Sequence, residues 1–302
     1  MLADRGTKEI TLLGQTVNSY LHREGGRQVR LPDLLARLDA IDGLERLRFV
    51  TSYPGDFAED LFAAMRDLPK VCEYLHLPVQ SGSDSVLRRM KRHYTVQDFL
   101  DLVARGREMV PDLTLASDFI VGFCGETPAE FEASLALLAD MRFKNIFCFK
   151  YSPRPETVAD KSLPDDVPHE TKRERNQRML EAQERISLDQ NQALVGQSVE
   201  VLVEGYSKAA VKAQEAEQSR GQEKSWRRSD QLVGRTRTDR IVVFSGRPVH
   251  IGRLLRVRVT GASALTLFGD PVDNGDGEGT SAAGMADPKP STTRPGPVEE
   301  LP

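Results

Sequence analysis

Polar residues follow directly after several short apolar runs in the amino-terminal half of the sequence. The segments read GQTVNSY from residue 14, QSGSD from 80, GFCGET from 122 and YSPRP from 151. Where such runs form parallel strands, their carboxyl ends open into loops on one edge of the sheet, and ligands bind there. The residues that we expect on this edge are amides, hydroxyls, carboxylates and glycines: Gly14, Gln15, Asn18, Gln80, Ser81, Gly82, Ser83, Asp118, Gly122, Gly125, Glu126, Tyr151, Ser152 and Arg154.

Together these residues could line a pocket for a small polar ligand that has an adenosine end and an amino-acid end. Taken one at a time, each segment is equally typical of a turn and a helix cap. The pocket prediction therefore depends on all four segments occurring in this order.

The apolar runs alternate with amphipathic stretches, which predicts a parallel sheet with helices outside it. We expect five strands, at 9–14, 46–51, 73–79, 113–121 and 145–151. We expect five helices between and after them, at 31–41, 56–67, 83–92, 95–109 and 127–141. Thr127 and Glu130 have the spacing of a capping box at one helix start. Because crossovers are right-handed, the sheet should curl into a barrel or partial barrel over residues 1–160.

The pattern changes after residue 160. A charged helix is predicted at 169–194, within a linker that covers 161–195. Apolar and polar residues then alternate with glycine turns over 196–270, which predicts a small antiparallel β-barrel interrupted by a polar insert at 207–229. Residues 271–302 are rich in glycine, proline and serine, and we expect a disordered tail there. The fold class is therefore α/β followed by a small β-barrel.

Basic residues concentrate in the predicted small barrel. Residues 196–270 carry 13 lysines and arginines against 8 acidic residues, although the whole chain has a net charge of −4. This distribution points to a polyanion partner. Arg256 and Arg258 alternate with apolar residues and should share one face. The candidate RNA-binding residues are Arg235, Arg237, Arg240, Arg253, Arg256 and Arg258. A merely solvated face is the alternative, and the few aromatic residues favour contacts to the phosphate backbone over base stacking.

The remaining reactive side chains are dispersed. Cys72, Cys124 and Cys148 form no C-x-x-C pair and no disulfide framework, so we predict no metal-binding residue. His76 lies inside a predicted strand, and we expect a hydrogen-bonding role there rather than catalysis. No apolar run has the length of a membrane span, about 18 residues, and no signal peptide opens the sequence. A cytoplasmic location is therefore expected.

Five segments resemble the MiaB-type tRNA methylthiotransferases, and they occur in one order over roughly residues 8–270. They read GQTVNSY, TSYPGDF, HLPVQSGSDSVLRRMKRHYT, SDFIVGFCGET and FKYSPRPET. The resemblance implies a radical S-adenosylmethionine (SAM) barrel followed by a TRAM domain, a small RNA-binding β-barrel. It implies a transferase that adds a 2-methylthio group to N6-isopentenyladenosine beside the anticodon of tRNA.

The same resemblance implies SAM and two 4Fe–4S clusters as cofactors. The implied partners are tRNA, a sulfur donor and an electron donor. By motif position, Gln15 and Asn18 match the segment near the amino-acid end of SAM, and Gln80 and Ser81 match the region near its ribose. The strand from Asp118 to Gly122 matches the one that supports the adenine.

The sequence departs from the family in two places. The family's C-x-x-x-C-x-x-C loop and its amino-terminal cluster domain are not found in the sequence, in which MLADRGTKE precedes the first strand. Cys124 stands where the family usually has proline, and it has no neighbouring cysteine with which to hold a cluster. We therefore expect a chain that is incomplete for catalysis: a fragment, a mis-started reading frame or a degenerate copy. The alternatives are the sister class that modifies a ribosomal protein and a non-catalytic RNA-binding remnant.

Overall fold

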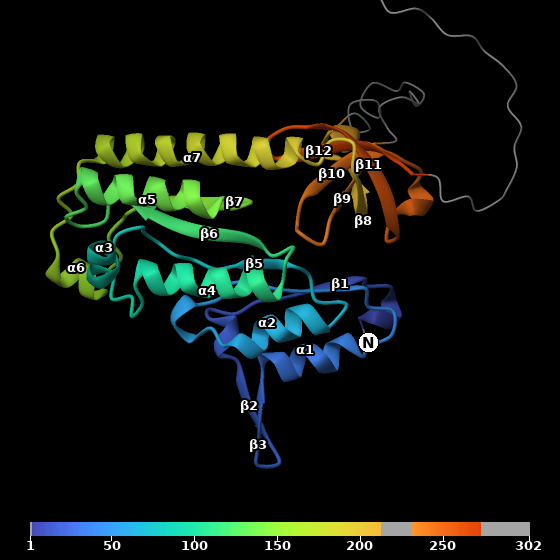
Figure 1. Ribbon diagram of the computed structural model, residues 1–302, viewed down its shortest axis with the longest axis horizontal. Coiled ribbons are helices and arrows are strands. Elements are labelled where there is room, and N and C mark those ends of the chain that lie inside the picture. The colour runs from blue at the N-terminus through green and yellow to red at the C-terminus, as the bar shows by residue number, and fades with distance from the viewer. Residues whose placement is uncertain (1, 213–230, 273–302) are drawn as a thin grey trace, which may run out of the picture. The chain divides into compact units, whose positions relative to one another are not determined.

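The computed structural model describes residues 2–212 and 231–272 (Figure 1). Most of the polar insert predicted at 207–229, and nearly all of the tail predicted from 271, lie outside the described residues. The described residues belong to one compact unit.

Five parallel strands form the sheet of the α/β part, and all five predicted strands are present. They are β1 (Glu9–Leu12), β4 (Arg46–Phe49), β5 (Tyr74–His76), β6 (Thr114–Val121) and β7 (Asn145–Lys150). Strand β1 pairs with β4, and β6 pairs with both β5 and β7. A bridge between Leu47 and Val71 connects the two groups. Among the described residues no ladder joins β7 back to β1, so the barrel is partial, as the sequence predicts.

Five helices cover this sheet, close to the positions that the sequence predicts, and α5 begins at the predicted cap residue Thr127. They are α1 (Leu31–Asp39), α2 (Glu59–Asp67), α3 (Asp84–Arg89), α4 (Val96–Met109) and α5 (Pro128–Met141). Thr95 and Thr127 each form a full capping box with the acidic residue three positions later. Large apolar side chains fill the space between helices and sheet, and Phe49, Phe119 and Phe143 are fully buried.

A short hairpin was not predicted. Strands β2 (Leu21–Glu24) and β3 (Arg27–Arg30) project from the body below α1 and α2 in Figure 1. Gly25 and Gly26 both have positive φ, 57° and 84°, which suits a two-residue hairpin turn. Every residue of β2 is exposed, so the strand lacks the apolar alternation that makes a strand recognisable from sequence. A short helix, α6 (Val158–Ser162), was also missed.

The long helix α7 (His169–Gln192) runs beside β7 and α5 (Figure 1). Its contact with the sheet is largely polar. Asn176 donates to the Cys148 carbonyl at 2.8 Å, Gln183 to the Phe143 carbonyl at 2.8 Å and Ser187 to the Lys144 carbonyl at 3.0 Å. These side chains satisfy backbone acceptors along the β7 edge. This explains why the helix has only a thin apolar stripe.

The five carboxyl-terminal strands close into the small barrel that the sequence predicts. They are β8 (Ser198–Tyr206), β9 (Gln231–Arg235), β10 (Ile241–Ser245), β11 (Leu254–Ala262) and β12 (Thr266–Pro271). Four of the pairs are antiparallel, and β10 pairs with β12 in parallel. A closed ring with an odd number of strands cannot alternate direction throughout, so one parallel pair is unavoidable. The antiparallel prediction is therefore right for all pairs but this one.

The Gly234→Ala variant should destabilise the small barrel. A Cβ atom on Gly234 would lie 2.2 Å from the Leu202 carbonyl oxygen, so two paired strands would have to separate. We expect a loss of about 1–3 kcal/mol in the free energy of unfolding, measured with urea. The control is Gly205→Ala in β8, where an added Cβ meets no atom within 4 Å. Equal losses in the two variants would contradict the prediction.

Stability should fall in acid as Glu130 takes up a proton. Burial alone would raise the pKa of Glu130, but hydrogen bonds from Arg89, at 3.0 and 3.2 Å, and from the Thr127 amide lower it to about 2. Because the unfolded chain then binds this proton more readily, the contribution is full above pH 4.5 and is lost as the pH falls toward 2.

The check is the free energy of unfolding as a function of pH. Glu130→Gln should flatten its decline below pH 4.5. Glu132→Gln, on the same helix in an exposed pair with Arg178, should leave the decline unchanged. A parallel decline in the parent and in Glu130→Gln would count against the assignment.

Candidate functional site

A cavity of about 600 Å³ opens at the carboxyl ends of β5, β6 and β7. This volume is within the usual range for a small-molecule site. Its polar lining residues include Gln80, Asp118, Tyr151 and Ser152, and its basic ones are Arg89, Lys91, Arg92, Lys150 and Arg154. The sequence predicts a pocket at this edge, but it did not single out Lys91, Arg92 or Lys150. Lys150 directly precedes the strand-end segment that begins at residue 151, and this position is the signal that could have identified it. Lys91 and Arg92 lie at the end of the helix predicted at 83–92, where no local pattern marks them as cavity residues.

Gln80 and Asp118 lie side by side in this cavity. The Gln80 backbone amide donates to the Asp118 backbone carbonyl at 2.9 Å, and the Ile120 backbone amide donates to the Gln80 backbone carbonyl at 3.0 Å. Gln80 has a φ of 72°, a strained value for a residue with a side chain, and these two bonds hold it there. No other described residue bonds to the Gln80 side-chain amide. A donor-and-acceptor amide therefore borders a carboxylate, which suits a ligand with several hydroxyl or amino groups.

Ser81 and Gly82 pack against helix α5 instead of facing the cavity. The Ser81 side chain is buried, its hydroxyl oxygen accepts from the Ser83 amide at 3.2 Å, and it lies 3.3 Å from the Ser134 hydroxyl. The Gly82 amide donates to the same Ser134 hydroxyl at 2.9 Å. A Cβ on Gly82 would lie 2.4 Å from the Ala133 carbonyl oxygen, so glycine is required for this close approach to α5. Ser81 does not line the cavity.

Gly122 is likewise part of a buried network. Its φ is 69°, and a Cβ there would lie 2.3 Å from the Lys172 side chain. Its amide donates to the Glu126 carboxylate at 2.6 Å, and Arg175 pairs with the same carboxylate at 2.6 Å. Burial raises the pKa of Glu126, while the Gly122 amide and Arg175 oppose that shift. The network fastens the loop after β6 to helix α7.

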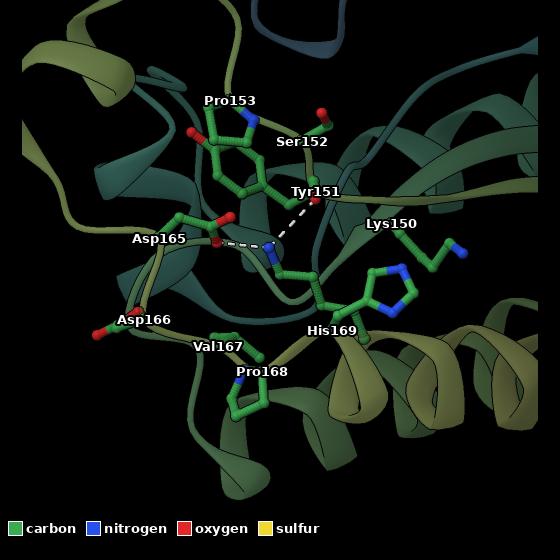
Figure 2. Close-up of a pocket in the computed structure, with 10 residues that line it drawn as sticks. Lys150, Tyr151, Ser152, Pro153, Asp165, Asp166, Val167, Pro168 and His169 are labelled. Atoms are coloured by element: carbon green, nitrogen blue, oxygen red, sulfur yellow. Dashed lines mark hydrogen bonds and ion pairs between the residues drawn. The ribbon is translucent and has the colours of Figure 1, made fainter.

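A second cavity, of about 510 Å³, lies where the segment after β7 meets the start of α7 (Figure 2). The buried Lys172 lines it, and its ammonium donates to the Asp165 carboxylate and, at 3.3 Å, to the Tyr151 carbonyl. The ammonium also lies 5.2 Å from the centre of the Tyr151 ring. One lysine thus holds together the two walls of this cavity.

Gln15 and Asn18 follow β1 and do not line the larger cavity. The Asn18 side chain donates to the Tyr53 carbonyl at 3.0 Å and accepts from the Tyr53 amide at 2.7 Å. It therefore ties the loop after β1 to the loop after β4. Gln15 is exposed. Of the six residues predicted to bind the cofactor, the structure brings Gln80 and Asp118 together in one cavity.

The six candidate RNA-binding arginines divide into two groups. Arg253, Arg256 and Arg258 are exposed, and no described residue pairs with their guanidinium groups. The exposed Phe268 belongs to the neighbouring strand β12 and is opposite Gly261 in the ladder. Arg256 and Arg258 point outward from β11, as the alternation in the sequence predicts.

Arg235, Arg237 and Arg240 instead bond within the protein. Arg237 makes a two-pronged contact with the Glu73 carboxylate at 2.7 and 2.9 Å. Arg235 pairs with Asp239 at 2.8 Å, and Arg240 donates to the Asn191 side chain at 2.6 Å. Because their guanidinium groups already have partners within the protein, the structure does not support the prediction that these three arginines bind RNA. The exposed arginines of the first group remain candidates.

The cysteines do not fit an iron–sulfur cluster. Within residues 2–212 and 231–272, no three His, Cys, Asp or Glu side chains gather in a way that could hold a metal ion. Burial raises the pKa of the Cys72 thiol, and it raises the pKa of the Cys148 thiol to about 12. Cluster ligands are thiolates, so these environments disfavour the ligating form. We therefore assign no redox step to these residues.

The helices of the described part of the chain include none that is long and apolar enough to cross a lipid bilayer.

Two family models match the sequence. Residues 1–138 match the Radical SAM superfamily, and residues 222–272 match the TRAM domain. The tRNA-2-methylthio-N(6)-dimethylallyladenosine synthase of Rhodopirellula baltica is 48% identical over 275 residues, which cover 89% of this chain and 54% of that protein. The protein of the same name from Moorella thermoacetica is 46% identical over 276 residues, which cover 90% of this chain and 57% of that protein.

The chain thus spans about half the length of the curated relatives it matches. The order of the two matched domains agrees with the partial α/β barrel and the closed small barrel described above. The chain therefore belongs to the radical SAM superfamily, carries a TRAM domain and is related to the tRNA methylthiotransferases.

Proposed function

We propose that this chain forms the SAM-binding and RNA-binding part of a tRNA methylthiotransferase. The reaction would add a 2-methylthio group to N6-isopentenyladenosine next to the anticodon. The observation that carries the proposal is the cavity at the strand ends, where Gln80 and Asp118 present an amide and a carboxylate in a chain 48% identical to an enzyme named for this product.

The residues of this chain would bind and orient the reactants. Gln80 and Asp118 would hold the adenosine end of SAM, and Lys91, Lys150 and Arg154 would attract phosphates to the mouth of the cavity. A bound SAM would supply the methyl group and, together with an iron–sulfur cluster, the radical. A sulfur donor and an electron donor would be further partners, and the reaction would take place in the cytoplasm.

The small barrel would bind the RNA backbone. Arg256 and Arg258 point to solvent from alternate positions of one strand, and Arg253 precedes that strand. None of the described residues pairs an acidic group with these guanidinium groups, so they are available to pair with phosphates. This arrangement supports an RNA substrate, because several guanidinium groups on one face can neutralise several phosphates of a polyanion.

Removing the cavity's polar groups should weaken SAM binding. Asp118→Ala and Gln80→Ala should each lower the affinity about tenfold, since a hydrogen bond to or from such a group contributes roughly 1–3 kcal/mol. Isothermal titration calorimetry with SAM is the measurement. Gln28→Ala, at an exposed position of β3 outside the cavity, is the matched control. Gln15→Ala tests the alternative site after β1, because Gln15 is exposed and lies outside the cavity. If Gln15→Ala loses affinity and the two cavity variants do not, the site lies at the end of β1 instead.

Neutralising the free arginines should weaken RNA binding and reduce its salt dependence. For the double variant Arg256→Gln with Arg258→Gln, the slope of log K against log salt should become shallower by about 0.7–0.9 for each phosphate that the protein no longer neutralises. Fluorescence anisotropy with an anticodon stem-loop RNA measures both quantities. Arg66→Gln, an exposed arginine paired with Asp67 on α2, should change neither. An unchanged slope in the double variant would exclude phosphate binding through this face.

A further inference from the structure

His76 bridges two elements at the edge of the sheet. Its Nε2 atom lies 3.0 Å from Asp118 Oδ1, and its Nδ1 atom lies 3.3 Å from the Thr51 backbone nitrogen. A backbone amide can only donate, so Nδ1 must be the unprotonated acceptor. The hydrogen therefore sits on Nε2 and is donated to the carboxylate. The ring is kept in place by an edge contact with Phe147, 6.0 Å between ring centres.

Thr51, whose backbone amide donates to His76 Nδ1, has a constrained backbone conformation. Thr51 has a φ of 69°, an unfavourable value for a β-branched residue. Its carbonyl accepts from the Val17 amide at 3.1 Å, and the next amide, of Ser52, donates to the His76 carbonyl at 3.2 Å. Hydrogen bonds thus connect the ends of β1, β4, β5 and β6 in one chain. Strained backbone held by surrounding bonds is typical of functional sites.

The chain of bonds ends at the carboxylate in the cavity. His76 Nε2 is hydrogen-bonded to Asp118 Oδ1, and no described residue bonds to Oδ2. Asp118 lines the 600 Å³ cavity together with the unpaired Gln80 amide. Oδ1 of Asp118 is therefore fixed by the His76 ring, and Oδ2 remains available to a ligand. An amide beside a carboxylate oxygen matches the hydroxyl pair of a ribose or the amino edge of an adenine.

We propose that His76 is a positioning residue, which as the Nε2–H tautomer fixes Asp118 so that Oδ2 and the Gln80 amide bind an adenosine. The inference rests on the proposed function, since the adenosine is either that of SAM or that of the RNA substrate. His76 itself does not line the cavity, so it would act through Asp118.

The test compares two substitutions of His76 in the 302-residue chain. His76→Phe keeps a ring against Phe147 but removes both hydrogen bonds, and His76→Gln keeps an N–H donor for Asp118. Two probes separate the sources of adenosine: S-adenosylhomocysteine and a single-stranded anticodon-loop RNA. For one probe, His76→Phe should lower the affinity at least about tenfold and His76→Gln should lose less. His22→Gln, on the exposed strand β2, should change neither affinity.

Nitrogen-15 NMR of the histidine rings reports the tautomer and the hydrogen bonding of His76 directly. A His76 that only fills space would show no change of these signals when a ligand binds at Asp118. The parent should show His76 as the Nε2–H tautomer, because the Thr51 amide requires Nδ1 as its acceptor. Asp118→Asn should keep that tautomer but shift the Nε2 signal, because a neutral amide oxygen is a weaker acceptor than a carboxylate. Titration with the probe that binds should shift the His76 Nε2 signal in the parent. These spectra are recorded on folded proteins, so they decide the matter even if His76→Phe fails to fold.

The outcomes are distinguishable. If the parent binds neither probe, both the proposed function and this inference fail. If the parent binds a probe and His76→Phe binds it equally well, the proposed function stands and the inference is overturned. An Nδ1–H tautomer in the parent would overturn the inference as well, since that form cannot accept the Thr51 amide and donate to Asp118 together.

Discussion

The edge where the parallel strands end is held together by side-chain hydrogen bonds, and the cavity depends on them. A parallel ladder stops before the loops begin, so the loops need other connections. Asn18 joins the loops after β1 and β4, and His76 joins the loop after β4 to β6. Because each amide and ring nitrogen in these links is used, a shift of one loop must break a bond in the next. The geometry at Asp118 is thus fixed by residues far away in the sequence.

The opposite end of the sheet is fixed by buried arginines. Arg46 and Arg48 belong to β4 and are 1% and 4% exposed. Arg46 donates to the Arg235 carbonyl at 2.6 Å, and Arg48 donates to the carbonyls of Thr236 and Arg237 at 2.7 Å. A buried cation is tolerated only where it is paired or hydrogen-bonded. Here carbonyls of a turn in the small barrel, more than 180 residues away, provide those bonds together with two carboxylates, Glu200 for Arg46 and Glu9 for Arg48.

Local patterns made the elements predictable, while distant partners decided which side chains remained free. The strands and capped helices of the α/β part were predicted because apolar periodicity and caps act within a few residues. Gln80 and Asp118 were predicted as site residues and lie in the cavity. Ser81 and Gly122 were predicted too, but Ser134 on α5 and Lys172 on α7 draw them into packing. Those partners are some 50 residues away and carry no local signal.

The same distinction explains the arginines. Arg256 and Arg258 were placed on one outward face because strand alternation is local, and both are exposed. The local sequence around Arg235, Arg237 and Arg240 does not indicate that Arg237 bonds to Glu73 and Arg240 to Asn191, because these partners are distant in the sequence. Only cations without such partners contribute strongly to the surrounding field, since a paired charge is largely cancelled. In the described part of the chain, unpaired cations remain both at the cavity mouth and on β11, although the whole chain is acidic. Attraction of a polyanion therefore depends on how the charges are paired rather than on their sum.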